Sequence, residues 1–414
     1  MSELLEKCTL AKDAGYKMVS VSTVTKNNAL EAIANALVER ADEIIAANNI
    51  DIENAKKNGT RQAMIDRLTL TKERIDGIAE GVRQVKALAD PIGELIKMWK
   101  RPNGLTIGQK RVPMGVIAII YEARPNVTVD AAVLCLKTSN ACILRGGSEA
   151  INSNKAVMKI MQDAAYGVGI PEGTLNIIED TSRETATQLM KMNGYVDLLI
   201  PRGGKGLIRS VVENATVPVV ETAAGNCHVY DADADIDMAV KIVLNAKVQR
   251  PSVCNAAETL LIDKKIADKF IPVMFKALKE KNVEIRADQN SKAIFADVND
   301  ATDEDYYTEY NDYIMAVKVV DGIDEAIEHI NKYNTKHSEA IVTNNYEHSQ
   351  KFLNEVDAAA VYVNASTRFT DGFEFGFGAE IGISTQKMHA RGPMGLEALT
   401  SIKYIIYGDG QIRE

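Results

Sequence analysis

Apolar residues return every three or four positions in the first part of the chain. One such stretch runs from Asn27 to Asn49 and includes Leu30, Ile33 and Leu37, and another runs from Thr71 to Leu88. At 3.6 residues per turn, this spacing gathers the apolar side chains on one face of a helix. The chain is therefore expected to open with amphipathic helices.

The pattern changes at residues 95–111. Two extended segments, LIKMWK and LTIGQKRV, flank Pro102, Asn103 and Gly104, which form a typical turn cluster. We predict a β-hairpin here. Because an apolar hairpin with side chains such as Trp99 is not stable alone in water, we expect it to pair with another subunit.

From residue 116 onward, short apolar runs alternate with segments of helical spacing. The predicted strands are 116–121, 141–145, 174–179 and 196–200, and the intervening segments 129–139, 148–169 and 182–192 are predicted helices. Nearly continuous apolar strands that alternate with helices are typical of a parallel sheet covered on both faces. This part of the chain is expected to form an α/β domain.

The same alternation resumes after residue 237 and predicts a second α/β domain. Its expected strands are 257–262, 314–320, 339–343 and 358–364, and its expected helices are 237–248, 264–281 and 322–333. The acidic segment 297–313 is predicted to be a surface loop, and residues 276–292 are predicted to be a solvated helix end followed by a loop.

Composition and charge narrow the class of protein. The chain has 414 residues, 46% of them hydrophobic and 25% charged, which is ordinary for a globular protein of two or three domains. Its net charge of −9 argues against nucleic acid as a partner. The longest apolar run, Val112 to Tyr121, is too short to span a membrane, and the N-terminus lacks the pattern of a signal peptide. Five irregularly spaced cysteines without a CxxC pair indicate reduced thiols and a cytoplasmic location.

Two glycine-rich segments are candidates for ligand binding. The segment 372–382 has the spacing GxGxxxG rather than the GxGxxG of a classical dinucleotide fingerprint, so we expect only a loop there. Gly203, Gly204 and Lys205 follow a predicted strand and open a predicted helix, an arrangement that presents N–H groups and positive charge to an anion. An ordinary tight turn between strand and helix explains the same residues equally well.

Cys254 is the thiol with the most reactive surroundings. It lies in a polar segment just before a predicted strand, four residues after Arg250. A loop cysteine near a cation can have a lowered pKa and act as a nucleophile, although a lone cysteine is more often structural. Cys135 and Cys142, by contrast, lie in apolar runs and are predicted core residues. The five histidines form no metal-binding motif, and no GxSxG motif of a serine hydrolase occurs, so we predict no metal site.

Seven segments taken together closely resemble one known family. They are YEARPNVTVDAA, ILRGGSEA, LIPRGGKGLI, VETAAGNCHVY, QRPSVCNAAETLL, KYNTKHSEAIVT and RGPMGLEALTSIKY. In this order they resemble the γ-glutamyl phosphate reductases, also called glutamate-5-semialdehyde dehydrogenases, a divergent family of the aldehyde dehydrogenase superfamily. The resemblance extends from about Val112 to Tyr407.

The resemblance implies an α/β fold of the aldehyde dehydrogenase type, with two Rossmann-like domains and a small β element for oligomerisation. It implies a cofactor-binding domain at 1–94 and 112–225 and a catalytic domain at 226–390. The hairpin at 95–111 and a C-terminal strand within 400–410 would form the oligomerisation element.

The resemblance also implies roles for single residues in catalysis. Cys254 matches the catalytic thiol that attacks an acyl phosphate to form a thioester. Asn126 matches an asparagine whose amide helps to form the oxyanion hole, a donor worth roughly 3 kcal/mol of barrier; capping of a helix near Val127 is the alternative. Glu221 lies 33 residues before Cys254 (254 − 221 = 33), as does the general base of hydrolytic aldehyde dehydrogenases. Because its segment ETAAGN departs from theirs, Glu221 is expected to assist thiol deprotonation or to hold structure.

Further positions match the binding of cofactor and substrate. Arg145 and Ser148 match the residues that read the adenosine ribose, where a cation beside a hydroxyl favours NADP over NAD. Gly203, Gly204 and Lys205 match the turn near the pyrophosphate. Two further sets complete the implied site: Glu309 for the nicotinamide ribose, and Arg124, Arg368 and Arg391 as unranked candidates for the α-carboxylate of the substrate.

The implied activity is NADPH-dependent reduction of L-glutamyl 5-phosphate to L-glutamate 5-semialdehyde and phosphate in proline biosynthesis. A hydrolytic NAD(P)-dependent aldehyde dehydrogenase, a catalytically silent nucleotide-binding protein and a cofactor-free cysteine hydrolase are the alternatives. The expected partners are a small-molecule substrate and further copies of the chain, as a homodimer or homotetramer, together with functional coupling to glutamate 5-kinase. Neither a nucleic acid nor a membrane is expected as a partner.

Overall fold

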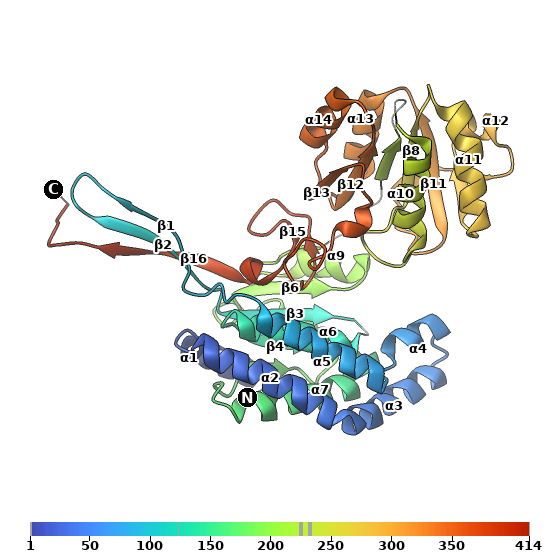
Figure 1. Ribbon diagram of the computed structural model, residues 1–414. Coiled ribbons are helices and arrows are strands. Elements are labelled where there is room, and N and C mark those ends of the chain that lie inside the picture. The colour runs from blue at the N-terminus through green and yellow to red at the C-terminus, as the bar shows by residue number, and fades with distance from the viewer. Residues whose placement is uncertain (1, 123, 223–226, 231–233, 414) are drawn as a thin grey trace. The chain divides into compact units, whose positions relative to one another are not determined.

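The structure is a computed structural model that describes residues 2–413 apart from residues 123, 223–226 and 231–233. The chain divides into two compact units (Figure 1). Unit 1 comprises residues 1–221, 376–382 and 394–414, and unit 2 comprises residues 222–375 and 383–393. Among the described helices, none combines the length and the apolar character that a membrane span requires. The division of the chain into cofactor-binding and catalytic domains stays a prediction, and its boundary at 225/226 lies outside the described residues.

Unit 1 is built around a four-stranded parallel sheet in the order β5-β4-β3-β6. Its strands are β3 (Val116–Tyr121), β4 (Ala141–Arg145), β5 (Leu175–Ile177) and β6 (Leu198–Arg202). The central strand β3 is buried along its whole length, as its continuous apolar sequence predicted. Because β4 and β5 lie on one side of β3 and β6 on the other, the strand order reverses between β3 and β6, where α/β proteins commonly bind ligands.

Helices pack against this sheet and against one another (Figure 1). They are α1 (Glu3–Met18), α2 (Thr23–Glu39), α3 (Ala41–Lys57), α4 (Gln62–Leu68), α5 (Lys72–Ala87), α6 (Pro125–Lys137), α7 (Ile151–Tyr166), α8 (Arg183–Leu189) and α9 (Lys205–Asn214), with 3-10 turns η1 (Ser148–Ala150) and η4 (Leu396–Leu399). The apolar pattern over residues 27–49 spans two helices, because the chain leaves helical geometry at Arg40 (φ −106°, ψ 24°).

A separate three-stranded antiparallel sheet completes unit 1, in the order β1-β2-β16. Strands β1 (Leu95–Lys100) and β2 (Thr106–Pro113) form the predicted hairpin, and β16 (Thr400–Tyr407) pairs with β2 along its whole length. Gly104 adopts the left-handed conformation in the turn (φ 92°), as its position predicted. The three strands lie side by side in Figure 1.

Unit 2 contains a seven-stranded sheet in the order β10-β9-β11-β8-β7-β12-β13, with every pair parallel. Its strands are β7 (Cys227–Tyr230), β8 (Thr259–Asp263), β9 (Glu284–Ala287), β10 (Asn299–Asp300), β11 (Ile314–Val320), β12 (Ser338–Val342) and β13 (Ala360–Val363). The helices are α10 (Ile236–Val248), α11 (Ala267–Glu280), α12 (Gln289–Ile294), α13 (Ile323–Tyr333) and α14 (Tyr346–Glu355), with 3-10 turns η2 (Asp303–Tyr307) and η3 (Thr367–Phe369) and a short antiparallel pair of β14 (Ile383–Ser384) and β15 (Gly392–Pro393).

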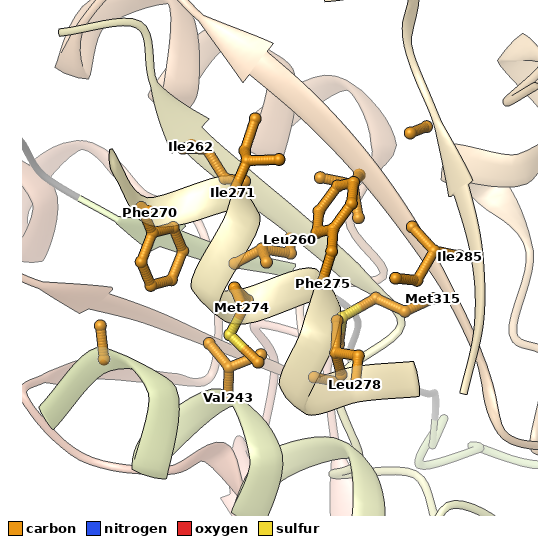
Figure 2. Close-up of a cluster of buried hydrophobic side chains, with 14 of the residues drawn as sticks. Val243, Leu260, Ile262, Phe270, Ile271, Met274, Phe275, Leu278, Ile285 and Met315 are labelled. Carbon is orange, nitrogen blue, oxygen red and sulfur yellow. The ribbon is translucent and has the colours of Figure 1, made fainter. Parts of the chain in front are cut away.

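Figure 2 shows the largest described core cluster of unit 2. Helix α11 places Phe270, Met274 and Phe275 against side chains of the sheet such as Leu260 and Met315, and all of them are fully buried. The apolar face of α11 therefore anchors β8, the strand that directly follows the segment containing Cys254.

Two predictions about unit 2 are wrong. Residues 276–292 are not only a helix end and loop, because they contain β9 and the start of α12. Charged residues obscured the strand in the sequence, yet Ile285 and Ala287 alternate with Glu284 and Arg286 and are buried in the sheet. The predicted surface loop 297–313 is also more ordered than expected, because Asp305 and Tyr306 are buried there.

Candidate active site

Cys254 lies on the turn that links α10 to β8, as the sequence predicted, and its side chain is partly exposed. Backbone bonds close this turn: the amide of Ala257 donates to the carbonyl of Ala246 (2.9 Å), and that of Ala256 donates to the carbonyl of Val253 (3.0 Å). The thiol is thus held on a short connection between a helix and a buried strand. This placement suits a nucleophile that must stay accessible and yet be held in position.

Arg368 connects the two sides of the Cys254 turn. Its Nε donates to Oε1 of Gln249 (2.8 Å), and its Nη1 donates to Oδ1 of Asn255, the residue next to Cys254. In return, Nδ2 of Asn255 donates to the carbonyl of Thr370 (3.0 Å), and the hydroxyl of Thr367 donates to the carbonyl of Asn255 (2.7 Å). The turn that carries the thiol is therefore tied to η3.

The guanidinium of Arg368 also lies within electrostatic range of the thiol. Burial lowers the pKa of Arg368, the positive charge of Arg250 lowers it further, and Cys254 acts in the opposite direction. Arg250 is exposed on the same turn. In the described part of the chain, neither Arg250 nor Arg368 forms an ion pair with a carboxylate, although Asp371 and Glu374 influence Arg368 at longer range.

A fully buried ion pair lies beneath the same turn. Nζ of Lys247, at the end of α10, is 2.6 Å from Oε2 of Glu258, at the start of β8, and both side chains are at most 1% exposed. Burial raises the pKa of Glu258 to about 7 against the opposing effect of Lys247, and burial lowers the pKa of Lys247. The amide of Asn311 donates to Oε1 of Glu258 (3.2 Å). The pair therefore links the Cys254 turn to the segment that contains Glu309.

Glu309 follows η2 and is partly exposed, and its charge acts on both Lys247 and Glu258. The segment is anchored by Asp305, which accepts hydrogen bonds from Nη1 of Arg286 (2.8 Å), the hydroxyl of Tyr310 (2.7 Å) and Thr302. Burial alone would raise the pKa of Asp305, but these donors outweigh it and hold the pKa below its usual range. Unit 2 thus brings Cys254, Glu309 and Arg368 to one region.

Arg391, the second predicted substrate residue of this unit, forms an ion pair with another residue of the chain. Its Nη2 lies 2.7 Å from Oδ1 of Asp357, which Lys336 and Lys387 also contact. Since Asp357 already neutralises this guanidinium, Arg391 is a weaker candidate for an anion of the substrate than Arg368.

The remaining predicted residues belong to unit 1 and lie at the carboxyl ends of its strands. Arg145 ends β4, and Ser148 begins η1 directly afterwards and is exposed. Nη2 of Arg145 donates to the carbonyls of Thr181 and Ser182, whereas its Nε is buried and makes no hydrogen bond to any described residue. Burial lowers the pKa of Arg145.

The turn between β6 and α9 consists of Gly203 and Gly204, and Lys205 is the first residue of α9. All three residues are exposed. The amide of Gly204 donates to Oε2 of Glu122 (2.9 Å), which follows β3. A side chain at Gly203 would approach the Glu122 carboxyl carbon to 2.7 Å, so any larger residue there would displace the Glu122 side chain. A carboxylate of the chain itself therefore interacts with the predicted pyrophosphate turn at the point where the strand order reverses.

Asn126 lies in the first turn of α6, which begins at Pro125. Its Nδ2 donates to Oδ2 of Asp130 (3.0 Å), and burial raises the pKa of Asp130 to about 6. The alternative that Asn126 caps the helix is wrong, because Arg124 is the residue before α6 and no side chain caps that end. One N–H of the Asn126 amide is thus donated to Asp130, and the second N–H can be donated to an oxyanion.

Glu221, the predicted residue that precedes Cys254 in the chain, is the last residue of unit 1.

These residues fit a nicotinamide dinucleotide on two observations. Lys205 and Gly206 are in the first turn of α9, where backbone N–H groups have no acceptor within the helix and can bind a phosphate. The Nε of Arg145, which makes no hydrogen bond to a described residue, is a buried donor at the end of β4 in the same sheet. Because the Glu122 carboxylate accepts the Gly204 amide at the start of α9, a phosphate that binds there would have to displace this carboxylate or bind beside it.

Several residues of these sites were not predicted from the sequence. Glu122, Asp130, Gln249, Asn255 and the Lys247–Glu258 pair act through contacts between segments far apart in the chain. The only signal in the sequence was their position beside predicted residues, such as Asn255 after Cys254. The side chain of Cys227 lies outside the described part of the chain, and Cys135 and Cys142 are fully buried, as predicted.

Comparison with known proteins assigns the class. The model of the aldehyde dehydrogenase family matches residues 2–294 and 293–405, so the chain belongs to that family. An acetylating aldehyde dehydrogenase from Geobacillus thermoglucosidasius has the same fold, with a TM-score of 0.69 over 100% of this chain and 98% of that one at 18% identity. The fold predicted from the sequence is therefore confirmed.

Within this class, the chain belongs to the γ-glutamyl phosphate reductases. It is 63% identical over 413 residues to a γ-glutamyl phosphate reductase from Clostridium perfringens, with 100% of both chains covered. The crystal structure of a γ-glutamyl phosphate reductase from Thermotoga maritima is 50% identical and has a TM-score of 0.98, with 100% of both chains covered. The resemblance found in the sequence is confirmed.

Proposed function

We propose that this protein is an oxidoreductase that reduces L-glutamyl 5-phosphate to L-glutamate 5-semialdehyde and phosphate, with NADPH as the reductant. The relatives that carry this name support the substrate and the direction of reaction. The observation that carries the mechanism is the partly exposed thiol of Cys254 on a turn fixed by Arg368, Gln249 and Asn255.

The chain's own residues account for the covalent part of the reaction. The thiolate of Cys254 attacks the acyl carbon, the carbon–oxygen bond to the phosphate breaks, and a thioester forms. The amide of Asn126, oriented by Asp130, is the proposed donor to the oxyanion. A thioester at a fixed sulfur holds the acyl carbon in one place and makes it a better hydride acceptor than a carboxylate.

Arg145, Ser148, Gly203, Gly204, Lys205 and Glu309 are proposed to hold the cofactor. When bound, NADPH supplies the hydride that reduces the thioester carbon. A nicotinamide cofactor follows from the family, and the choice of NADP rests on Arg145, whose cationic side chain suits a 2′-phosphate and whose buried Nε makes no hydrogen bond to a described residue. Assembly as a homodimer or homotetramer, coupling to glutamate 5-kinase and a cytoplasmic location stay predictions.

The requirement for phosphate tests the reaction. Run in reverse, oxidation of glutamate 5-semialdehyde with NADP⁺ should require inorganic phosphate, because phosphate must discharge the thioester. Undiminished oxidation without phosphate would instead establish a hydrolytic dehydrogenase with a base such as Glu221.

A Cys254→Ala variant should lose at least about a thousandfold in kcat while NADPH still raises its unfolding midpoint. Unchanged turnover in that variant would refute the nucleophile.

A further inference from the structure

Unit 2 contains arginines of two kinds. Arg286 is paired with Glu284 and Asp305, and Arg391 is paired with Asp357. Arg250 and Arg368 form no ion pair with any described carboxylate, although the chain as a whole carries nine more acidic than basic residues (57 − 48 = 9). Two cations beside one turn, neither of them in an ion pair with a described carboxylate, repel each other, and a bound anion would relieve this repulsion.

The side chain of Arg368 is held in one orientation by hydrogen bonds within unit 2. Its Nε and Nη1 donate to Gln249 and Asn255, so neutral partners fix the orientation of the guanidinium plane and the nearest carboxylates, Asp371 and Glu374, act on it only at longer range. Its second terminal nitrogen, Nη2, donates no hydrogen bond to a described residue. The side chain is thus oriented before a ligand arrives, and a donor remains for that ligand.

Both cations are close to the nucleophile in the chain or in space. Arg250 precedes Cys254 on the same turn. Arg368 donates a hydrogen bond to Asn255, the residue that directly follows Cys254. The group that must bind next to the attacked carbon is the one that leaves it. In the proposed substrate this is the phosphoryl group, whereas the α-carboxylate is four carbon–carbon bonds away from the acyl carbon. A phosphoryl dianion also matches two guanidinium groups better than a single carboxylate does.

We propose that Arg250 and Arg368 form the subsite for the phosphoryl group of the acyl phosphate, and hence for inorganic phosphate in the reverse reaction. This proposal rests on the proposed function. When the thiolate forms the sulfur–carbon bond, the leaving oxygen takes the electron pair of the broken carbon–oxygen bond, and phosphate takes up a proton from water. The two guanidinium groups stabilise the negative charge that develops on the leaving oxygen.

Reverse kinetics separate this subsite from a site for the α-carboxylate. Arg250→Gln and Arg368→Gln variants are compared with wild type in oxidation of glutamate 5-semialdehyde, with the KM values for phosphate and for semialdehyde measured separately. Loss of a charged hydrogen bond of about 1.5 to 3 kcal/mol should raise the KM for phosphate about tenfold or more, with the KM for semialdehyde nearly unchanged. Lys351→Gln, which removes a positive charge on α14 that pairs with Asp324 of α13, is the matched control and should change neither value.

Two outcomes overturn the proposal. If the KM for semialdehyde rises and that for phosphate does not, the arginines hold the α-carboxylate. If both values stay at the wild-type level, the arginines do not bind the substrate. A wild-type enzyme that needs no phosphate would instead refute the proposed function itself, so the two failures are distinguishable.

A second measurement covers the case in which Arg368→Gln disturbs the turn. Inorganic phosphate alone should slow alkylation of Cys254 by iodoacetamide in the wild type, with the modified residue identified by mass spectrometry. The protection should disappear in Arg250→Gln and persist in Arg368→Lys, which keeps the charge. Protection that persists unchanged in Arg250→Gln would exclude Arg250 from the subsite.

Discussion

Cys254 differs from the other described cysteines in its surroundings rather than in its spacing. Burial raises the pKa of Cys8 to about 12, and a hydrogen bond with Cys142 together with burial raises the pKa of Cys135 well above its usual range, so both thiols stay protonated and inert. Cys254 is partly exposed and has Arg368 within electrostatic range. The surroundings that distinguish this thiol therefore include the charge of a residue 114 positions away in the chain (368 − 254 = 114).

A second residue of unit 2 controls stability rather than catalysis. His337 is fully buried; its Nδ1 contacts the hydroxyl of Ser338 (2.7 Å), and its Nε2 has no partner among described residues. Burial lowers the pKa of His337 to about 3. Between that value and the ordinary value of 6.5, the unfolded chain binds a proton that the folded chain does not. The contribution of this residue to stability is therefore complete above pH 6.5 and is lost as the pH falls toward 3.

A His337→Asn variant should flatten the acid side of the stability profile. Between pH 7 and pH 5, the free energy of unfolding of the variant should fall by about 2 kcal/mol less than that of the wild type. Urea unfolding at a series of pH values measures this difference. His329→Asn should flatten the profile in the same way, because burial lowers the pKa of His329 to about 4. An unchanged slope in both variants would mean that these side chains are protonated in the fold.

At the scale of secondary-structure elements, the functional segments of unit 2 are held by contacts between the loops that connect helices and strands. Helix α10 and strand β8 place Lys247 and Glu258 on either side of the Cys254 turn, and Glu258 accepts the Asn311 amide from the segment of Glu309. A buried pair is costly to break, because removal of one partner leaves the other charge without compensation. We therefore regard the pair as the element that fixes two functional segments relative to each other within unit 2.

A double-mutant cycle on this pair tests that role. Lys247→Met should destabilise the protein by about 3 to 5 kcal/mol. The double variant Lys247→Met/Glu258→Gln should recover a large part of this loss, because Gln is neutral and still accepts the Asn311 amide. Urea unfolding of the wild type, the double variant and both single variants, Lys247→Met and Glu258→Gln, gives the coupling energy, and strictly additive losses would show that the two side chains do not interact. If the pair positions Glu309, the double variant should also have a raised KM for NADPH.

At the scale of the whole molecule, the β1-β2-β16 sheet has an apolar face exposed to solvent. Ile402, Tyr404 and Ile406 lie on one face of β16 and are 44%, 54% and 59% exposed, and Trp99 packs edge-on against Tyr404. Both β1 and β16 are edge strands of this sheet. Exposed apolar edge strands are prone to pair with another chain, so we expect a second copy of the protein to cover them.

Light scattering after gel filtration tests this expectation. The wild type should have a mass of at least twice the 45.2 kDa of one chain. Ile402→Glu and Ile406→Glu should shift the mass toward that of the monomer, because a charge in an apolar interface is costly to bury. Tyr346→Glu makes a similar change at a side chain that is 75% exposed on α14 and should leave the mass unchanged. A wild-type protein of monomer mass would contradict the role of this sheet.

The sequence by itself determined the family and most of the elements, and it singled out Cys254 as the proposed nucleophile. Continuous apolar strands such as β3 and the helical period of α5 and α11 are local patterns, and local patterns report burial directly. β9 was missed for the converse reason: a short strand with charged residues on alternate positions looks like a loop until its neighbours β11 and β10 pair with it.

Only the tertiary structure decided which charges are free and which are paired. Three arginines were equivalent candidates in the sequence, and the structure distinguishes two of them, through Asp357 at Arg391 and through Gln249 and Asn255 at Arg368. It likewise placed Glu122 at the turn of Gly204 and Asp130 at Asn126. The physical reason is that electrostatic and hydrogen-bond partners are set by distances in space, which residue types and their spacing along the chain do not encode.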